Sequence, residues 1–137
     1  MQEVNHQLRA PSVGEVMAYL QTNDISTPRF MVLRILENTD GATISEIATQ
    51  LKLTLGSASQ LIDRLEQEGY VSRQDDSEDR RIRRIFLLEK GRAVVKDIQA
   101  ILLTSLQHQL AKLPHETITA LLTIFTETRR LLRKEAL

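Results

Sequence analysis

A helix-like segment that runs directly into a charged hairpin is the feature that most constrains this chain. The helical pattern covers Thr54–Glu68, and two strand-like stretches follow it, Tyr70–Arg73 and Arg83–Leu87. The turn between these strands is first acidic and then strongly basic. This order is typical of a winged helix-turn-helix, whose helix enters a major groove of DNA while the hairpin, or wing, reaches the backbone or a minor groove. The sequence therefore predicts binding to double-stranded DNA.

Basic residues cluster in this hairpin. Four arginines, Arg80, Arg81, Arg83 and Arg84, fall within five positions. The whole chain of 137 residues contains 18 acidic and 18 basic residues, so its formal net charge is zero. Zero net charge argues against a protein that is basic over its whole surface, but a DNA footprint needs only a local basic patch.

Composition excludes several other classes of protein. The chain has no cysteine, which excludes disulfides, thiol redox chemistry and thiolate metal sites. No apolar stretch approaches the roughly 18 residues that a membrane span needs. The polar N-terminal stretch at 1–10 lacks the apolar centre of a signal peptide. We therefore expect a soluble, cytoplasmic protein, and a hydrophobic content of 42 % is enough for a real core.

Helix signals divide the chain before the hairpin. After the polar arm at 1–10, Ser12 is placed to cap a helix that runs to about Thr22. Thr27-Pro28 begins the next helix, since proline is tolerated in a first turn. Thr43 and Glu46 have the spacing of a capping box, which predicts the start of a short third helix.

Two long amphipathic segments follow the hairpin. The first runs from Glu89 to about Lys112, and Leu113-Pro114 separates it from the second. A small winged core cannot bury two such apolar stripes alone, so we expect the same surface on a second copy to cover them in a homodimer. A helical cap folded back on its own core is the alternative. The apolar positions are Val95, Ile98, Leu102, Leu106, Leu121 and Phe125.

The predicted fold class is mainly α with a small β-hairpin, a winged helix-turn-helix with a helical dimerisation region. We expect residues 1–26 to form an N-terminal arm and a dimerisation helix. Residues 27–88 are the expected DNA-binding lobe, and residues 89–137 the C-terminal dimerisation helices. A dimer suits DNA, because two recognition helices about one helical turn apart match a palindromic operator.

The chain resembles the MarR family of bacterial transcriptional regulators over nearly its whole length. The resemblance is strongest in the recognition-helix segment, in the wing, and at the start of the following helix. The matching stretches are Leu53–Glu66, Gly69-Tyr70-Val71, Asp79-Arg80-Arg81 and Leu87–Gly91. The resemblance implies a dimer of winged helix-turn-helix subunits that represses genes. It also implies release of DNA when a small molecule binds between the dimerisation helices and the DNA-binding lobe.

The same resemblance assigns roles to individual residues. Ser57, Ser59 and Gln60 match exposed positions that meet base edges or phosphates, and Asp79 matches an acid that orients Arg81 toward a minor groove. Gln60 has the side chain to read adenine through a bidentate pair, or it is a solvated surface residue. Arg64 is placed to reach a phosphate or to pair with Glu68 one turn later. The predicted DNA-binding set is Thr54, Ser57, Ser59, Gln60, Arg64, Arg80, Arg81 and Arg83.

Other functions have weaker support in the sequence. Met17, Tyr19 and Phe30 are candidates to line a small-molecule effector pocket, although such residues at helical spacing are more often core. The glycines form no phosphate-binding loop, no nucleophile–base pairing stands out, and the histidines are dispersed. We therefore expect no enzyme activity, catalytic residue, cofactor or metal. A winged-helix module that binds protein rather than DNA is the alternative function, and the zero net charge favours it.

Overall fold

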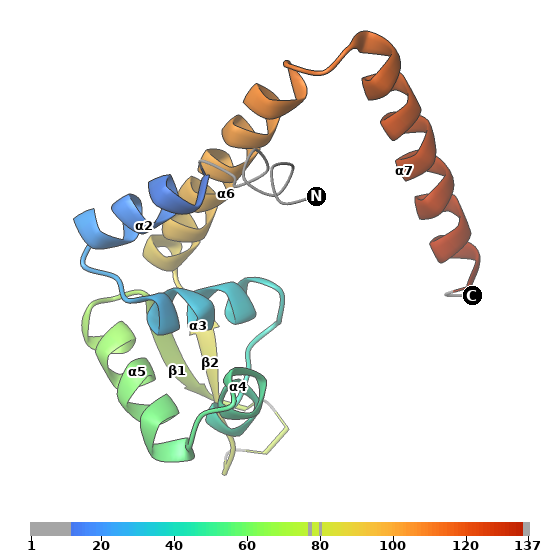
Figure 1. The fold of residues 1–137 in the computed structure, drawn as a ribbon. Coiled ribbons are helices and arrows are strands. Elements are labelled where there is room, and N and C mark those ends of the chain that lie inside the picture. The colour runs from blue at the N-terminus through green and yellow to red at the C-terminus, as the bar shows by residue number, and fades with distance from the viewer. Residues whose placement is uncertain (1–11, 77, 80, 136–137) are drawn as a thin grey trace. The chain divides into compact units, whose positions relative to one another are not determined.

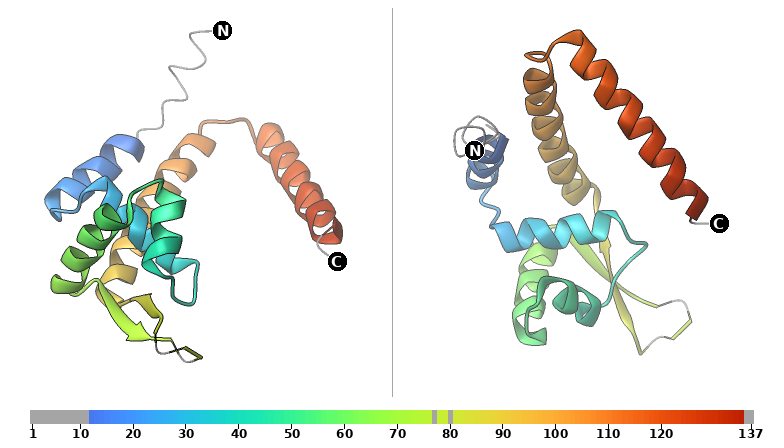
Figure 2. Two further views of the ribbon diagram at one scale, coloured as in Figure 1. Left: turned by 90° about the horizontal axis from the view of Figure 1, so that it is seen from below. Right: turned by 45° about the vertical axis from the view of Figure 1, so that its right-hand side comes forward.

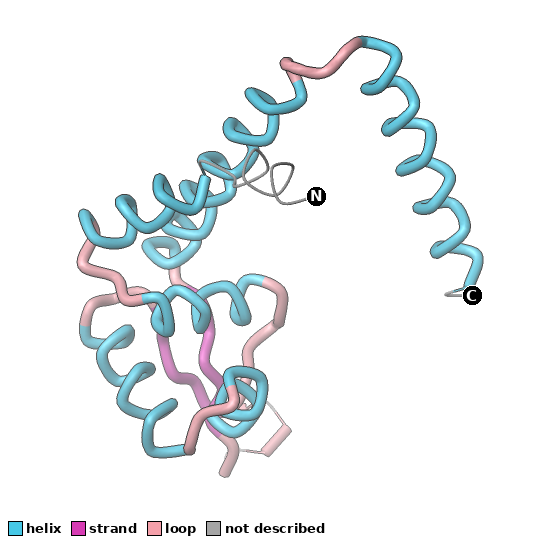
Figure 3. The backbone as a smooth tube through the Cα atoms, viewed as in Figure 1, coloured by secondary structure: helices cyan, strands magenta, loops and turns pink. Residues whose placement is uncertain are grey.

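A computed structural model describes residues 12–76, 78–79 and 81–135 of the chain. The arm expected at 1–10 lies outside these residues. The chain divides into two compact units, one that ends at Leu102 and a second, Leu103–Leu137, and each is described by itself. Figures 1 and 3 show the elements. In chain order they are α2 (Ser12–Thr22), α3 (Thr27–Glu37), α4 (Ile44–Leu51), α5 (Leu55–Gln67), β1 (Val71–Asp75), β2 (Arg83–Leu87), α6 (Glu89–Leu110) and α7 (His115–Glu135).

The fold class is the predicted one, helices with a small antiparallel hairpin in a winged helix-turn-helix arrangement. β1 pairs with β2 in a register that runs from Val71 opposite Leu87 to Asp75 opposite Arg83. Ala42 adds a short bridge to this hairpin, because its N–H and carbonyl both bond Ile85, at 3.1 and 2.8 Å. In Figure 1, α3, α4 and α5 gather around the hairpin.

Local sequence signals fix the ends of the helices around the recognition segment. Thr43 caps α4 in the expected capping box: its N–H bonds Glu46 Oε2 at 2.8 Å, and its Oγ1 accepts the Glu46 N–H at 3.2 Å. Gly69 follows the C-cap residue of α5 and has a φ of 76°. The Tyr70 N–H then bonds the Leu65 carbonyl at 2.8 Å, which completes a Schellman motif and turns the chain into β1.

The core of the first unit lies where α3, α4, α5, the hairpin and the first half of α6 meet. Its largest fully buried side chains include Leu33, Ile47, Leu65 and Ile85. Val95 and Ile98 of α6 belong to the same core, at 0 and 1 % exposure. The sequence predicts that these two residues belong to a stripe covered by a partner subunit. The lobe itself covers them, so that part of the prediction is wrong.

One glycine is required by packing against the hairpin. Gly41, in the turn before α4, has a φ of 82°. A Cβ at this position would lie 2.7 Å from Cε1 of Phe86 on β2. A side chain at this position would collide with the Phe86 ring, and the positive φ would strain the backbone. Glycine therefore lets the turn approach β2 closely enough for Ala42 to bridge Ile85.

The second unit contains the end of α6 and all of α7. The link between the two helices holds Leu113 and Pro114, where the sequence predicted a break. Large apolar side chains on both helices are exposed, among them Leu106 at 53 % and Phe125 at 70 %. No helix in the described part of the chain is long and apolar enough to cross a membrane.

Candidate nucleic-acid interface

The turn between α4 and α5 sets the angle of the recognition helix. Lys52 ends α4 in the left-handed conformation, with a φ of 54°. Its N–H bonds the Thr49 carbonyl at 3.2 Å, and the Leu53 N–H bonds the Ala48 carbonyl at 2.9 Å. Left-handed backbone is unfavourable for a residue with a Cβ, so these bonds and the packing of the two helices hold Lys52 there.

Thr54 caps the first turn of α5 by bonding Ser57, and both residues are predicted to contact DNA. Thr54 Oγ1 accepts the Ser57 N–H at 3.2 Å and donates to Ser57 Oγ at 2.9 Å. Both side chains remain exposed on the surface. A capped first turn presents a fixed set of atoms at the N-terminal end of the helix, which is the end that contacts base edges in helix-turn-helix proteins.

The later predicted residues of α5 lie on its outer face. Gln60 and Arg64 are exposed, and Ser59 is half-buried. Arg64 donates from Nε to Glu68 Oε1 at 3.2 Å, which is the structural pairing considered from the sequence. This pair is solvent-exposed on the arginine side, so it orients Arg64 without burying its charge.

Glu68 is also held from inside the lobe by Arg29, a residue that the sequence analysis missed. Arg29 on α3 is only 4 % exposed, and its guanidinium pairs with Glu68 and donates to the Asp24 carbonyl at 2.9 Å. Partial burial alone would raise the pKa of the Glu68 carboxyl, but the hydrogen bonds and charges of Arg64 and Arg29 outweigh it and lower that pKa. Arg29 gave no signal in the sequence, because only the fold shows that it is enclosed.

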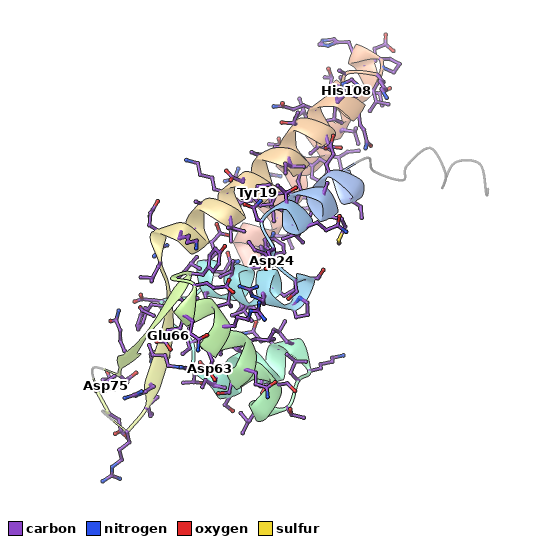
Figure 4. All side chains as sticks on the ribbon, turned by 90° about the vertical axis from the view of Figure 1, so that its left-hand side faces the viewer. Tyr19, Asp24, Asp63, Glu66, Asp75 and His108 are labelled. Atoms are coloured by element: carbon purple, nitrogen blue, oxygen red, sulfur yellow. The ribbon has the colours of Figure 1, made fainter. Side chains whose placement is uncertain are left out.

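Arg73 joins the recognition helix to the wing. Its guanidinium pairs with Asp63 and bonds Glu66 Oε2 at 2.6 Å, and its N–H donates to Glu66 Oε1 at 3.2 Å. Figure 4 shows Asp63 and Glu66 on α5 beside the hairpin, with Asp75 farther out along it. The side chain of Arg73 is 18 % exposed, so this arginine contributes to contacts within the protein.

The tip of the wing is organised by Asp76. Its Oδ1 accepts the backbone N–H groups of Glu78 and Asp79 at 2.8 and 3.2 Å, and its Oδ2 pairs with Arg84. The hydrogen bond from Arg84, followed by the two backbone bonds, lowers the pKa of Asp76 to about 2. Arg83, one of the predicted DNA contacts, is exposed, and its Nε lies 3.5 Å from Asp75 Oδ1.

Asp79 contacts Arg81 through the backbone. Its Oδ1 accepts the Arg81 N–H at 2.9 Å, which fixes the course of the chain at the tip. The side chain of Arg81 is exposed. The expected orientation of the Arg81 guanidinium by Asp79 remains a prediction, and Arg80 lies outside the described residues.

The predicted recognition-helix and wing residues come together at one end of the lobe. Figure 1 and the right-hand view of Figure 2 both show the start of α5 and the outer end of the hairpin at the same, lower end of this unit. One face therefore carries an exposed helix end and an arginine-bearing hairpin. This is the arrangement needed to contact adjacent grooves of a duplex.

The three candidate effector-pocket residues have different environments. Phe30 is buried in the core at 9 % exposure, and Met17 is 41 % exposed. Tyr19 donates its hydroxyl to Asp97 Oδ2 at 2.7 Å, linking α2 to α6. Burial and this hydrogen bond to a carboxylate raise the pKa of Tyr19 to about 12.

An open groove of about 560 Å³ lies elsewhere, between the start of α3 and the outer face of α5, with Gln60 and Arg64 in its wall.

Similarity to known proteins follows the same lobe. The MarR family model matches residues 25–82, from the turn before α3 to the tip of the wing. This lobe is therefore similar to the MarR family. The resemblance inferred from the recognition-helix and wing residues is therefore confirmed.

Among the described residues, no group of three or more histidine, aspartate or glutamate side chains is placed to hold a metal ion.

Relatives of known sequence are helix-turn-helix regulators. The uncharacterized HTH-type transcriptional regulator YfiV of Bacillus subtilis is 31 % identical over 91 residues, which are 66 % of this chain and 56 % of YfiV. SarZ of Staphylococcus haemolyticus, an HTH-type transcriptional regulator, is 32 % identical over 61 % of this chain and 56 % of its own. The chain thus spans about half the length of the curated relatives that it matches.

Solved structures share the fold over almost the whole chain. Transcriptional regulator Tm0710 of Thermotoga maritima superposes with a TM-score of 0.80 at 19 % identity, covering 98 % of this chain and 94 % of that one. MepR of S. aureus superposes with TM-scores of 0.73 in a mutant bound to an oligodeoxyribonucleotide and 0.74 when bound to ethidium bromide, both at 22 % identity. Each MepR match covers 96 % of this chain and at least 95 % of MepR.

Proposed function

We propose that this protein is a cytoplasmic transcriptional regulator that binds double-stranded DNA in a sequence-specific way. The observation that carries the proposal is the shared face of α5 and the wing, where the exposed Gln60 and Arg81 lie on elements placed to enter a groove. The similarity of this lobe to the MarR family and the relatives' regulator names support it. So does MepR, a protein of the same fold that has been seen with an oligodeoxyribonucleotide.

We further propose that the regulator is a homodimer. α7 supports this, because Leu122, Ile124, Phe125, Leu131 and Leu132 are each exposed by 52–70 %. A helix this apolar needs a partner surface to be stable in water. A second copy supplies the same surface and a second recognition helix, which suits a palindromic operator.

We also propose that the regulator is a repressor that releases DNA when a small molecule binds. MepR bound to ethidium bromide supports a ligand-responsive member of this fold. In this chain the candidate region is the junction of α2, α3 and α6, around Met17, Tyr19 and Phe30. The Tyr19–Asp97 hydrogen bond joins two of these helices, so a ligand that displaces it would alter how α2 sits on α6.

A winged-helix module that binds protein is the second candidate, and one observation favours it. Several arginines near the interface are neutralised within the protein: Arg64 by Glu68, Arg83 by Asp75, and Arg84 by Asp76. Paired arginines attract phosphates less strongly than free ones. DNA binding that depends on salt and on sequence separates the two candidates.

Selection of bound sequences from a random duplex pool tests the proposed function. We expect the full chain to enrich a two-fold symmetric sequence and to bind it at least about a thousandfold more tightly than random duplex at one fixed salt concentration. A log–log plot of affinity against salt should have a steep negative slope. A protein that enriches no sequence, or that binds every duplex equally, contradicts the proposal.

Two variants then separate base reading from backbone binding. Gln60→Ala should reduce discrimination against random duplex by about 1–3 kcal/mol and leave binding to random duplex unchanged. Arg81→Ala should weaken binding to both duplexes and reduce the salt slope by about one. Equal loss on both duplexes for Gln60→Ala would show that Gln60 is not a base reader.

A further inference from the structure

An apolar side chain stands at the beginning of the recognition helix. Leu55 is the first residue of α5 and is 60 % exposed. It lies three residues before the buried Ala58 and seven before the buried Ile62, a spacing that would ordinarily turn it toward the core. Its exposure is therefore a property of this position in the fold. Single exposed leucines are common on protein surfaces, so the position must carry the argument.

The neighbours of Leu55 leave it the prominent side chain of the first turn. Thr54 and Ser57 use their hydroxyls to bond each other and the backbone, at 2.9 and 3.2 Å. Gly56 has no side chain, and apart from its chain neighbours and its own helix backbone no heavy atom lies within 4 Å of the place where its Cβ would be. The first turn therefore presents an exposed isobutyl group beside two hydroxyls that are bonded to each other.

The location of this turn determines the surface that Leu55 meets. Residues at the N-terminal end of a recognition helix contact base edges in the major groove. Figures 1 and 2 place the start of α5 at the end of the lobe that also carries the wing tip. Base edges in the major groove are mostly hydrogen-bond donors and acceptors, and the C5-methyl of thymine is the apolar group among them.

We propose that Leu55 is a specificity-determining residue that reads the C5-methyl group of a thymine by apolar contact. This inference rests on the proposed function, because it requires α5 to lie in a major groove. Contact between the isobutyl group and the methyl removes apolar surface of both from water. A cytosine or a purine at the same position lacks this methyl group and binds less tightly.

The test deletes the methyl from the DNA and the isobutyl from the protein, separately and together. Sequences selected by the wild-type full chain are synthesised with each thymine replaced singly by uracil, which differs only in lacking the methyl. At one thymine in each half-site we expect wild-type affinity to fall about fourfold, which is about 0.8 kcal/mol at 1.4 kcal/mol per tenfold. Leu55→Ala should bind the thymine duplex less tightly and show less than about a 1.5-fold further loss on the uracil duplex.

A matched control keeps the experiment specific. Leu88→Ala removes a leucine that is 39 % exposed and lies between β2 and α6, at the end of the hairpin opposite to the wing tip. It should retain the fourfold uracil penalty, and thermal melting should show that both variants are folded. An undiminished penalty in Leu55→Ala, or the absence of any uracil-sensitive thymine in the selected sequence, overturns the inference. Failure to select any sequence overturns the proposed function first, before a leucine variant is made.

Discussion

A single carboxylate organises the wing at the residue scale. Asp76 accepts two backbone N–H groups with one oxygen and pairs with Arg84 through the other. These contacts lower its pKa from 3.8 to about 2. A group whose pKa is depressed by folding stabilises the folded state above its unfolded pKa, and this contribution disappears as the pH falls through the folded pKa. The Asp76 contribution is therefore fully present at neutral pH and is lost between about pH 4 and 2.

Asp76→Asn should lower the melting temperature at neutral pH, because the amide carries no charge to pair with Arg84. The difference from wild type should stay constant from about pH 8 to 5 and shrink between about pH 4 and 2, where the wild-type carboxyl becomes protonated. Melting followed by circular dichroism at each pH measures this. Asp40→Asn, at an exposed position before α4, is the control and should show no such narrowing. A difference that persists unchanged at pH 2 would contradict the assigned role.

At the scale of elements, Arg73 is the tie between α5 and β1. Arg73→Ala should cost about 1–2 kcal/mol of unfolding free energy, since it removes hydrogen bonds to two carboxylates. The cost stays below the 3–5 kcal/mol typical of a broken buried pair. The side chains of Asp63 and Glu66 are 48 and 37 % exposed, so water can solvate both carboxylates in the variant. Urea unfolding measures the difference.

Arg83→Ala is the matched control for this prediction. Its pair with Asp75 is exposed by 68 and 58 % on the two sides, so its loss should cost no more than about 0.5 kcal/mol. Arg73→Lys should fall between the two, because an ammonium keeps the charge but cannot reach both carboxylates as a planar fork. Equal stability for Arg73→Ala and Arg83→Ala would mean that the tie does not contribute to the fold.

Local signals explain how much of these elements the sequence predicted. Thr43, Gly69 and Pro114 act on their own neighbours in the chain, so the capping box, the end of α5 and the break before α7 were all visible from spacing. The hairpin followed from two alternating stretches and the charged turn between them. The recognition helix followed from the helical pattern of apolar residues, which also places Gln60 and Arg64 on its outer face.

Contacts between distant residues were not visible in the sequence. Arg29 and Glu68 are 39 positions apart, and no local sequence pattern near either residue predicts their ion pair. The contacts of Arg73 were equally invisible, because its two acidic partners lie on another element. Lys52 in the left-handed conformation is also a product of tertiary packing, since a lysine carries no local preference for it. The solvent exposure of Leu55 runs against the helical period for the same reason.

At the scale of the whole molecule, zero net charge and a basic interface are compatible. Arg64, Arg83 and Arg84 each pair with a carboxylate, so the positive charge on the proposed DNA face is partly neutralised. Non-specific affinity from phosphates should consequently be modest, and discrimination should depend more on the residues that meet bases.

The proposed homodimer rests on the exposed apolar positions of the second unit. Val95 and Ile98 are buried in the lobe, whereas Leu106 and Phe125 are exposed by 53 and 70 %. Leu106→Asp should split the proposed dimer or unfold its helices. Burying a leucine is worth about 1.5–3 kcal/mol, and removing a carboxylate from water into an apolar interface costs free energy. Light scattering of the wild type should give about twice the chain mass of 15.6 kDa.

Two comparisons distinguish loss of the interface from general damage. Leu88→Asp places the same charge at an exposed leucine of the first unit and should leave the mass unchanged. Phe125→Asp should copy Leu106→Asp, and both should lose helical signal and two-fold symmetric DNA binding together, since a monomer offers one recognition helix. A wild-type chain that is a well-folded monomer at micromolar concentration would refute the dimer. The exposed residues of α7 would then need a different partner.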